Sequence, residues 1–224
     1  MFILKLLCAY GSRKGASTVL SPLKKSFFLS LHHQYKKYKI MAKIEPIAKF
    51  ILSFEGGFVN DPKDKGGATN KGVTIATWRM QGYDKDGDGD IDVDDLKLIT
   101  DADATEVMRR CYWKRWRADE IKNQSIANLL VDWIWCSGTP SITITQSMLG
   151  LKADGIPGKQ TIAAINRQNP KTFFNRLKAR RKQFYEGIVK NNPSQKRFIN
   201  GWLRRLEAIK YGSLVTNRGT IIKC

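Results

Sequence analysis

Three polar side chains around a glycine-rich stretch have the types and spacing to cleave a glycosidic bond: Glu55, Asp64 and Thr69. This chemistry usually needs one carboxylic acid to protonate the leaving oxygen and a second carboxylate across the sugar as base or nucleophile. Glu55 could supply the acid and Asp64 the second carboxylate, with Thr69 holding a water. The spacing alone favours a plainer interpretation, a solvated helix end and aspartate turns, because acidic residues are common beside glycines.

The elements around Glu55 would set its position. Four apolar residues recur at helical spacing just before it: Ile47, Phe50, Ile51 and Phe54. We therefore predict a helix from Ile44 into Glu55, ended by Gly56-Gly57. The partly negative end of a helix disfavours a second negative charge, which suits a proton donor. The polar stretch that follows predicts a loop or a short hairpin near Val73.

The same stretch resembles the opening signature of glycoside hydrolase family 108, lysozyme-like N-acetylmuramidases of phages and bacteria. The matching run is Glu55-Gly56-Gly57-Phe58-Val59, Asp61-Pro62, Asp64, Gly66-Gly67, Thr69 and Gly72-Val73-Thr74. The resemblance implies that Glu55 is the catalytic acid. The order Glu, Asp, Thr also resembles the catalytic set of phage-type lysozymes. The threonine of that set lies six residues past the aspartate, whereas Thr69 lies five past Asp64.

A second resemblance lies further along the chain. The turn from Leu151 to Thr161 is similar to the Asp-Gly-x-x-Gly-x-x-Thr turn of small peptidoglycan-binding helical modules. Its Asp154 and Thr161 are expected to fix the turn rather than to touch sugar. This resemblance implies wall binding, with bacterial peptidoglycan as the partner. The resemblance to glycoside hydrolase family 108 implies that the β-1,4 bond between N-acetylmuramic acid and N-acetylglucosamine is cut.

The segment from Asp84 to Asp95 matches the calcium loop of an EF-hand. The loop takes oxygen ligands at positions 1, 3, 5, 7, 9 and 12, with glycine at 6 and an apolar residue at 8. These positions hold Asp84, Asp86, Asp88, Asp90, Asp92 and Asp95, with Gly89 and Ile91. The final aspartate replaces the usual glutamate, and the segment resembles the dockerin variant. We predict a structural calcium there and no cofactor for catalysis; the alternative is a solvated acidic turn.

The formal net charge of +19 predicts an anionic partner, such as nucleic acid, an anionic membrane or an acidic wall polymer. Residues 1–40 hold eight Lys and Arg and no Asp or Glu. The chain shows no zinc-finger spacing, no aromatic nucleic-acid-binding strand and no basic recognition helix after a clear turn, so we expect no specific nucleic acid. No apolar run approaches the roughly 20 residues needed to cross a bilayer.

We expect four parts. Residues 1–40 form a basic leader outside the fold, which fits a signal peptide poorly, with Met41 as the natural start. Residues 41–140 form the lysozyme-like catalytic region, with the loop 84–95 inserted. Residues 141–212 form the peptidoglycan-binding-like helical region, and 213–224 a loose tail. We expect a monomer that acts at the cell wall, either in the periplasm or outside the cell, or held in the cytoplasm until released as a phage-type lysin.

Helices separated by polar loops, with one short hairpin near Val73, predict a mainly α, lysozyme-like fold. We predict helices over 101–116, 126–135, 171–189 and 197–211. Asp132 lies inside the most apolar of these and must be paired if it is buried. We assign Asp61 and Trp116 to substrate binding. Aromatic faces stack on sugar rings, although aromatics at helical spacing more often belong to a core, so for Trp116 we favour the core and keep the cleft wall as the alternative.

Three other functions compete with hydrolysis. A lytic transglycosylase would use an acid like Glu55 without a hydrolytic water. A non-catalytic wall-binding module would bind without turnover, and a Glu55→Gln change would alter nothing. A basic nucleic-acid-binding protein would show a steep dependence on salt with DNA and no effect on cell walls.

Overall fold

The computed structural model describes residues 41–60 and 67–224. The predicted leader, residues 1–40, and the predicted site residues Asp61 and Asp64 lie outside the described residues. The described chain is mainly helical with small antiparallel sheets, as predicted. None of its helices has both the length and the apolar character needed to cross a membrane.

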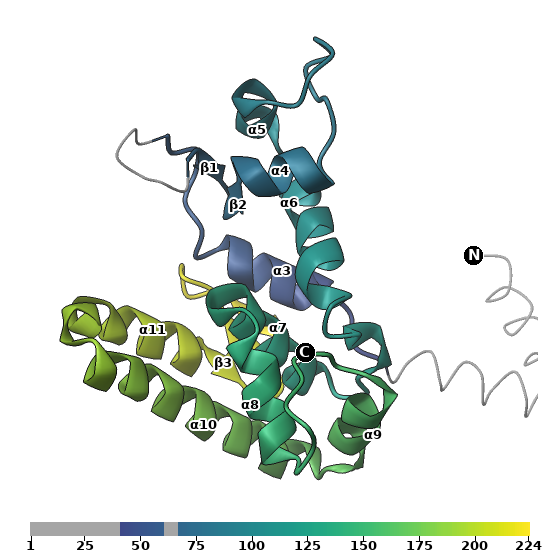
Figure 1. The fold of residues 1–224 in the computed structure, drawn as a ribbon, viewed down its shortest axis with the longest axis vertical. Helices are drawn as coiled ribbons and strands as arrows, with labels where there is room; N and C mark the ends of the chain where they lie inside the picture. Colours follow the sequence, from purple (N-terminus) through teal and green to yellow (C-terminus); the bar gives the residue numbers. More distant parts are fainter. Residues whose placement is uncertain (1–40, 61–66) are drawn as a thin grey trace, which may run out of the picture. The chain divides into compact units, whose positions relative to one another are not determined.

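The first half of the chain builds one lobe around a small apolar core (Figure 1). Its elements are α3 (Glu45–Leu52), β1 (Thr69–Asn70), β2 (Val73–Thr74), α4 (Ile75–Gln81), α5 (Val93–Leu98) and α6 (Asp101–Met108). The strands form a hairpin with Thr69 opposite Thr74. Trp78, Leu96 and Val107 are buried together beneath it. This core carries the hairpin that the sequence predicted.

The second half packs around α7 (Gln124–Ser137), the apolar helix predicted over 126–135. The surrounding helices are α8 (Pro140–Met148), α9 (Lys159–Arg167), α10 (Pro170–Asn191) and α11 (Lys196–Ala208). Figure 1 shows α10 and α11 running side by side as a helical hairpin. Short 3-10 turns, η2 (Ala118–Glu120) and η3 (Pro193–Gln195), join some of these helices. Helix α3 also belongs to this larger core through buried residues such as Phe50 and Ile51, so it lies between the two cores.

The predicted helix over 101–116 is divided. Thr100 caps α6 through a reciprocal capping box with Asp103. The α-helix ends at Met108 and continues as a π-helical turn, η1 (Arg109–Trp113). This turn places Tyr112 against Trp135 of α7, with ring centroids 4.8 Å apart.

The predicted loose tail is wrong. After α11 the chain forms three short strands, β3 (Ile209–Lys210), β4 (Ser213–Val215) and β5 (Ile221–Lys223), paired in that order. Leu214 is fully buried in the larger core. The backbone N–H of Asn217 donates to the hydroxyl of Ser53, just after α3. The end of the chain is therefore built into the wall beside Glu55.

Candidate active site

Glu55 lies three residues beyond the helix that was predicted to contain it. Helix α3 ends at Leu52, and the next three N–H groups bond back over one tight turn. The N–H of Glu55 donates to the carbonyl of Leu52 at 3.3 Å. Its side chain keeps 22% of its surface exposed. Glu55 is therefore held at the end of a buried helix, yet remains accessible.

The β1–β2 hairpin covers Glu55 from one side. Its turn has positive φ at both Lys71 (50°) and Gly72 (77°), which is the geometry of a tight hairpin turn. The N–H of Lys71 donates to the carbonyl of Gly56 at 3.2 Å. A Cβ on Gly72 would lie 2.5 Å from Cζ2 of Trp135 and 3.0 Å from Cδ of Glu55. Only glycine lets the hairpin backbone come this close.

Two donors hold the carboxylate of Glu55 on one oxygen. The indole N–H of Trp135 donates to Oε1 at 2.9 Å. The guanidinium of Arg205, on α11, donates to the same oxygen at 3.4 Å. Within the described residues, Oε2 receives no such bond. The arrangement fixes the carboxyl plane and leaves one oxygen available to an incoming group.

Arg205 also binds the buried Asp132, so it bridges two carboxylates. Its Nε and Nη2 donate to Oδ1 of Asp132 at 3.0 and 2.8 Å. Arg181 of α10 donates to Oδ2 at 2.7 Å. Asp132 and Arg181 are both fully buried. Burial alone raises the pKa of Asp132, but the charges of Arg205 and Arg181 outweigh it and hold that pKa below its usual range.

A pocket of about 1140 Å³ opens beside Glu55. Its walls come from α3, from α6 with the first residue of η1, and from the β4–β5 hairpin. Charged side chains of both signs line it: Glu45, Lys49, Asp101, Glu106, Arg109 and Arg218. Threonine hydroxyls from Thr105, Thr216 and Thr220 lie among them. Apolar residues such as Leu52, Ile221 and Ile222 line it as well, so the pocket is mixed in character, with Glu55 in its lining.

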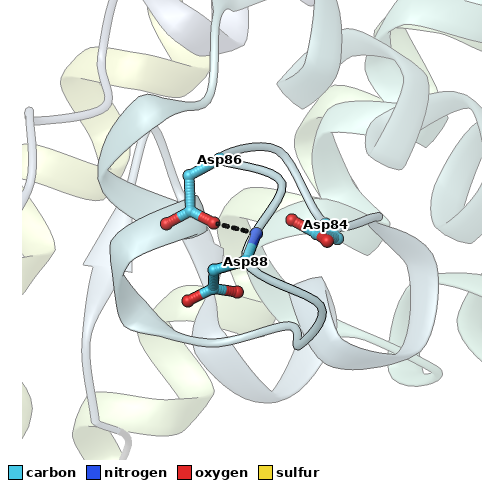
Figure 2. Close-up of side chains that lie close together, drawn as sticks. All are labelled: Asp84, Asp86 and Asp88. Atoms are coloured by element: carbon cyan, nitrogen blue, oxygen red, sulfur yellow. Dashed lines mark hydrogen bonds between the residues drawn. The ribbon is translucent and has the colours of Figure 1, made fainter.

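The acidic loop lies in the first lobe, between α4 and α5. Two groups of carboxylates gather there, one of Asp84, Asp86 and Asp88 and one of Asp90, Asp92 and Asp95. Figure 2 shows the first group on one turn of the loop, where the N–H of Asp88 donates to the carboxylate of Asp86. The carboxylate of Asp95 accepts from the N–H groups of Lys85, Asp86 and Asp92. The backbone therefore folds around the carboxylates.

The carboxylates of this loop repel one another. The charge of Asp88 is the main cause of a raised pKa at Asp90. Asp95 differs because the N–H groups of Asp92, Lys85 and Asp86 lower its pKa. Calcium at this loop stays a prediction.

Comparison with known proteins shows two family models that are similar to parts of this chain. Residues 48–138 match the family model described as glycosyl hydrolase 108. This region is similar to that family. Residues 140–207 match a second model, described as a predicted peptidoglycan domain. Glu55 lies in the glycosyl hydrolase 108 region, and its partner Arg205 lies in the peptidoglycan domain. Together the matches support a glycoside hydrolase that degrades or binds peptidoglycan.

One solved structure is similar to most of the described chain. It is titled "Structure of Brucella abortus SagA", and it shares 27% sequence identity with a TM-score of 0.58. The match covers 74% of this chain and 90% of that chain. No curated protein matches the sequence. The similarity spans both matched regions, so it supports their packing as one fold.

The predicted site residues of the glycosyl hydrolase 108 region meet different outcomes. Thr69 lies in β1, opposite Thr74, in the hairpin whose turn touches Glu55. Asp61 and Asp64 lie outside the described residues, so their roles stay predictions. The assignment of Trp116 to substrate binding was wrong. It is fully buried in the larger core and presents no face to a sugar.

The turn of the peptidoglycan domain does what its sequence predicted for Asp154. The carboxylate of Asp154 accepts from the N–H of Ile156 at 2.9 Å and from the amide of Gln146 at 2.8 Å. The side-chain oxygen Oε1 of the buried Gln146 accepts from the N–H of Gly155. These polar groups are used to fix the turn, while Lys152 and Lys159 line a smaller pocket of about 290 Å³ beside it.

Sequence reasoning missed three residues that hold Glu55: Trp135, Arg205 and Gly72. Trp135 was placed in a buried helix, and Arg205 was one cation among many in a basic helix. Gly72 was noted only as part of the signature. The pairing requirement of Asp132 was a signal for Arg205, because a buried aspartate inside an apolar helix demands a cation. The sequence did not show which cation.

Proposed function

We propose that this protein is a peptidoglycan hydrolase that cuts the β-1,4 bond between N-acetylmuramic acid and N-acetylglucosamine. Glu55 protonates the leaving glycosidic oxygen. Asp64 activates a water, which Thr69 helps to orient. This division of labour follows the two-carboxylate chemistry of glycoside hydrolysis.

The observation that carries the proposal is the way Glu55 is held. Its Oε1 is anchored by Trp135 and Arg205, while the side chain stays partly exposed and lines the large pocket. A general acid must be fixed within hydrogen-bond reach of the atom it protonates. A solvated helix end would need neither an indole nor a guanidinium on the same oxygen.

The pocket offers a glycan both polar partners and apolar surface. Hydroxyls and charged groups of both signs line it, and sugars offer hydroxyl and amide groups that pair with such walls. The net positive charge of the chain would favour approach to the anionic wall. We propose that the glycan strand lies in this pocket and passes Glu55.

The full-length protein and its Glu55→Gln variant test this proposal on purified peptidoglycan. Released fragments are reduced and identified by mass. Removing a general acid typically costs about 10²–10⁴-fold in rate. We expect reduced muramic-acid ends from the wild type. Glu55→Gln should release them at a rate lower by about this factor. Glu186→Gln is the matched control, because Glu186 is an exposed glutamate of α10 outside the pocket.

The products separate the competing functions. Anhydro-muramic ends would show that the protein is a lytic transglycosylase and would overturn hydrolysis. N-acetylglucosamine at the reducing ends would overturn the choice of bond. Sedimentation with peptidoglycan, but no release by either protein, would overturn catalysis and leave a wall-binding protein. Tight binding to DNA that weakens steeply with salt, with no effect on walls, would favour the nucleic-acid alternative.

We also propose that the loop from Asp84 to Asp95 binds a structural calcium. The support is the ligand order in the sequence and the gathering of two groups of carboxylates. A cation would relieve the repulsion that raises the pKa of Asp90. The ion would stiffen the first lobe, without a part in the proton transfers at Glu55.

A further inference from the structure

We propose that Arg205 is a positioning residue for Glu55 and that the peptidoglycan domain thereby completes the catalytic site. The inference rests on the proposed function, since it assigns a role in the same reaction. Arg205 does not need to touch the substrate. It holds the acid in place and is itself held from behind by Asp132.

The contacts of Arg205 fix its side chain from three directions. Its Nε and Nη2 bind Asp132, and its Nη1 reaches Oε1 of Glu55 at 3.4 Å. The guanidinium carbon lies 5.0 Å from the ring centroid of Phe54 and 5.7 Å from that of Phe50. Both rings belong to the segment that leads into Glu55. The guanidinium is therefore clamped against the same backbone that carries the acid.

The charges explain why this bridge is needed. Asp132 is one buried carboxylate between two guanidiniums, those of Arg181 and Arg205. Because one carboxylate neutralises only one cation, a positive charge is left over. The side chain of Arg205 is only 13% exposed, so water solvates that charge poorly. Nη1, the arm of Arg205 that does not bind Asp132, donates to Oε1 of Glu55.

The bridge joins the two matched regions. Glu55 lies within residues 48–138 and Arg205 within residues 140–207. The donor Trp135 and the anchor Asp132 both lie on α7, close to the boundary between the matches. The domain described by its relation to peptidoglycan therefore contributes a side chain to the acid's own environment, beyond any contact with the wall.

An arginine is suited to this place and a lysine is not. The planar guanidinium offers five donors in a fixed fork, which lets it bind two carboxylates at once. A lysine ammonium is a compact charge that could stay near Asp132 but lacks the second arm. Arg205→Lys therefore separates the role of the charge from the role of the fork.

The test measures kcat and KM separately on soluble, uncrosslinked peptidoglycan chains. We expect kcat to fall about 10–100-fold in Arg205→Gln and in Arg205→Lys, because a misplaced catalytic group costs up to about 100-fold. KM should stay within about threefold, since the bound glycan does not depend on this side chain. Arg204→Gln, an exposed arginine next along the same helix, is the matched control.

Folding is measured beside activity. Circular dichroism gives the thermal midpoint of each variant, and Arg205→Lys keeps the test open if Arg205→Gln does not fold. A wild-type kcat in Arg205→Gln, or full recovery of kcat in Arg205→Lys, would overturn the proposal. A loss of kcat matched by a loss of folded protein would reduce Arg205 to a structural role and overturn it too.

A second measurement does not depend on activity. The thermal midpoints of Glu55→Gln, Arg205→Gln and the double variant form a cycle. If Arg205 and Glu55 interact, the midpoint change of the double variant differs from the sum of the single changes. Additive changes would overturn the bridge. If the wild type is inactive on peptidoglycan but the midpoint changes are not additive, the proposed function is overturned while the contact between Arg205 and Glu55 is supported.

Discussion

The molecule handles carboxylates in two opposite ways, around Asp132 and in the loop from Asp84 to Asp95. Asp132 has no exposed surface, and two arginines occupy its two oxygens. The loop gathers most of its aspartates at the surface, although Asp95 is buried. Backbone N–H groups donate to several of the others. Asp88 raises the pKa of Asp90 in the loop, whereas arginines lower that of Asp132.

The difference shows where each charge finds its counterion. A buried charge must be paired by the chain itself, because no water can solvate it. An exposed group of carboxylates can leave that task to an ion from solution. The first arrangement builds its geometry during folding, and the second would complete it on binding. The predictions below test this contrast, from the largest expected effect to the smallest.

Asp132→Asn should give the largest loss of stability. The change keeps the shape but leaves the fully buried guanidinium of Arg181 without a counterion and removes the carboxylate that holds Arg205, and breaking a buried pair costs about 3–5 kcal/mol. Denaturant unfolding of the full-length protein measures this. Asp94→Asn is the control, because its exposed contact with Lys97 is worth at most about 1 kcal/mol. Equal losses from both changes would break the contrast between buried and exposed carboxylates.

The same variant should change the response to acid. The folded state lowers the pKa of Asp132, so its stabilisation is fully present above about pH 4, the ordinary aspartate value, and is lost as pH falls. Wild type should therefore lose stability below about pH 4 more steeply than Asp132→Asn. Parallel pH curves for the two proteins would contradict the pairing.

Calcium should give the next largest effect. Saturation at about 100 times the dissociation constant stabilises a folded protein by about 2.7 kcal/mol. We expect calcium to raise the thermal midpoint of wild type, and a chelator to reverse the change. Asp88→Asn should lose the response, while Asp94→Asn, outside the ligand set, should keep it. If calcium does not change the midpoint of wild type, the calcium site is overturned and the loop is a solvated acidic turn.

Gly72→Ala should give a smaller loss of stability together with a loss of activity. A left-handed conformation costs alanine about 1–2 kcal/mol, and the added Cβ would collide with Trp135. Gly150→Ala is the matched control, because Gly150 also has a positive φ but open space around its Cβ position. The excess loss in Gly72→Ala isolates the collision. Peptidoglycan release should fall only in Gly72→Ala, and equal release would argue against close packing at Glu55.

Much of the fold could be read from periodic apolar residues. The apolar helix α7 follows from a pattern of adequate length, and the hairpin beside Val73 follows from its polar, glycine-rich turn. The strands β3 to β5 were missed because each has only two or three residues, too few to show alternation. The end of α3 was placed too late, since Phe54 continues the apolar spacing after the α-helix has become a tighter turn.

The candidate site was only partly predictable. Glu55 could be found because its signature is contiguous in sequence. Arg205 lies 150 positions from Glu55 and 73 from Asp132, and many other cations surround it in sequence. Pairing across such distances depends on how helices pack, which local patterns do not encode. The assignment of Trp116 to substrate binding was wrong for the same reason, because helical spacing does not distinguish a side chain in the core from one in the wall of a cleft.

The chain's last strands have a consequence for engineering. Leu214 is buried in the main core, and the N–H of Asn217 is tied to Ser53 beside the helix that leads to Glu55. A fusion partner or affinity tag attached directly after Cys224 would follow closely on Ile221 and Ile222, which help to line the pocket. Cargo joined there without a long flexible spacer would obstruct entry of a polymeric substrate.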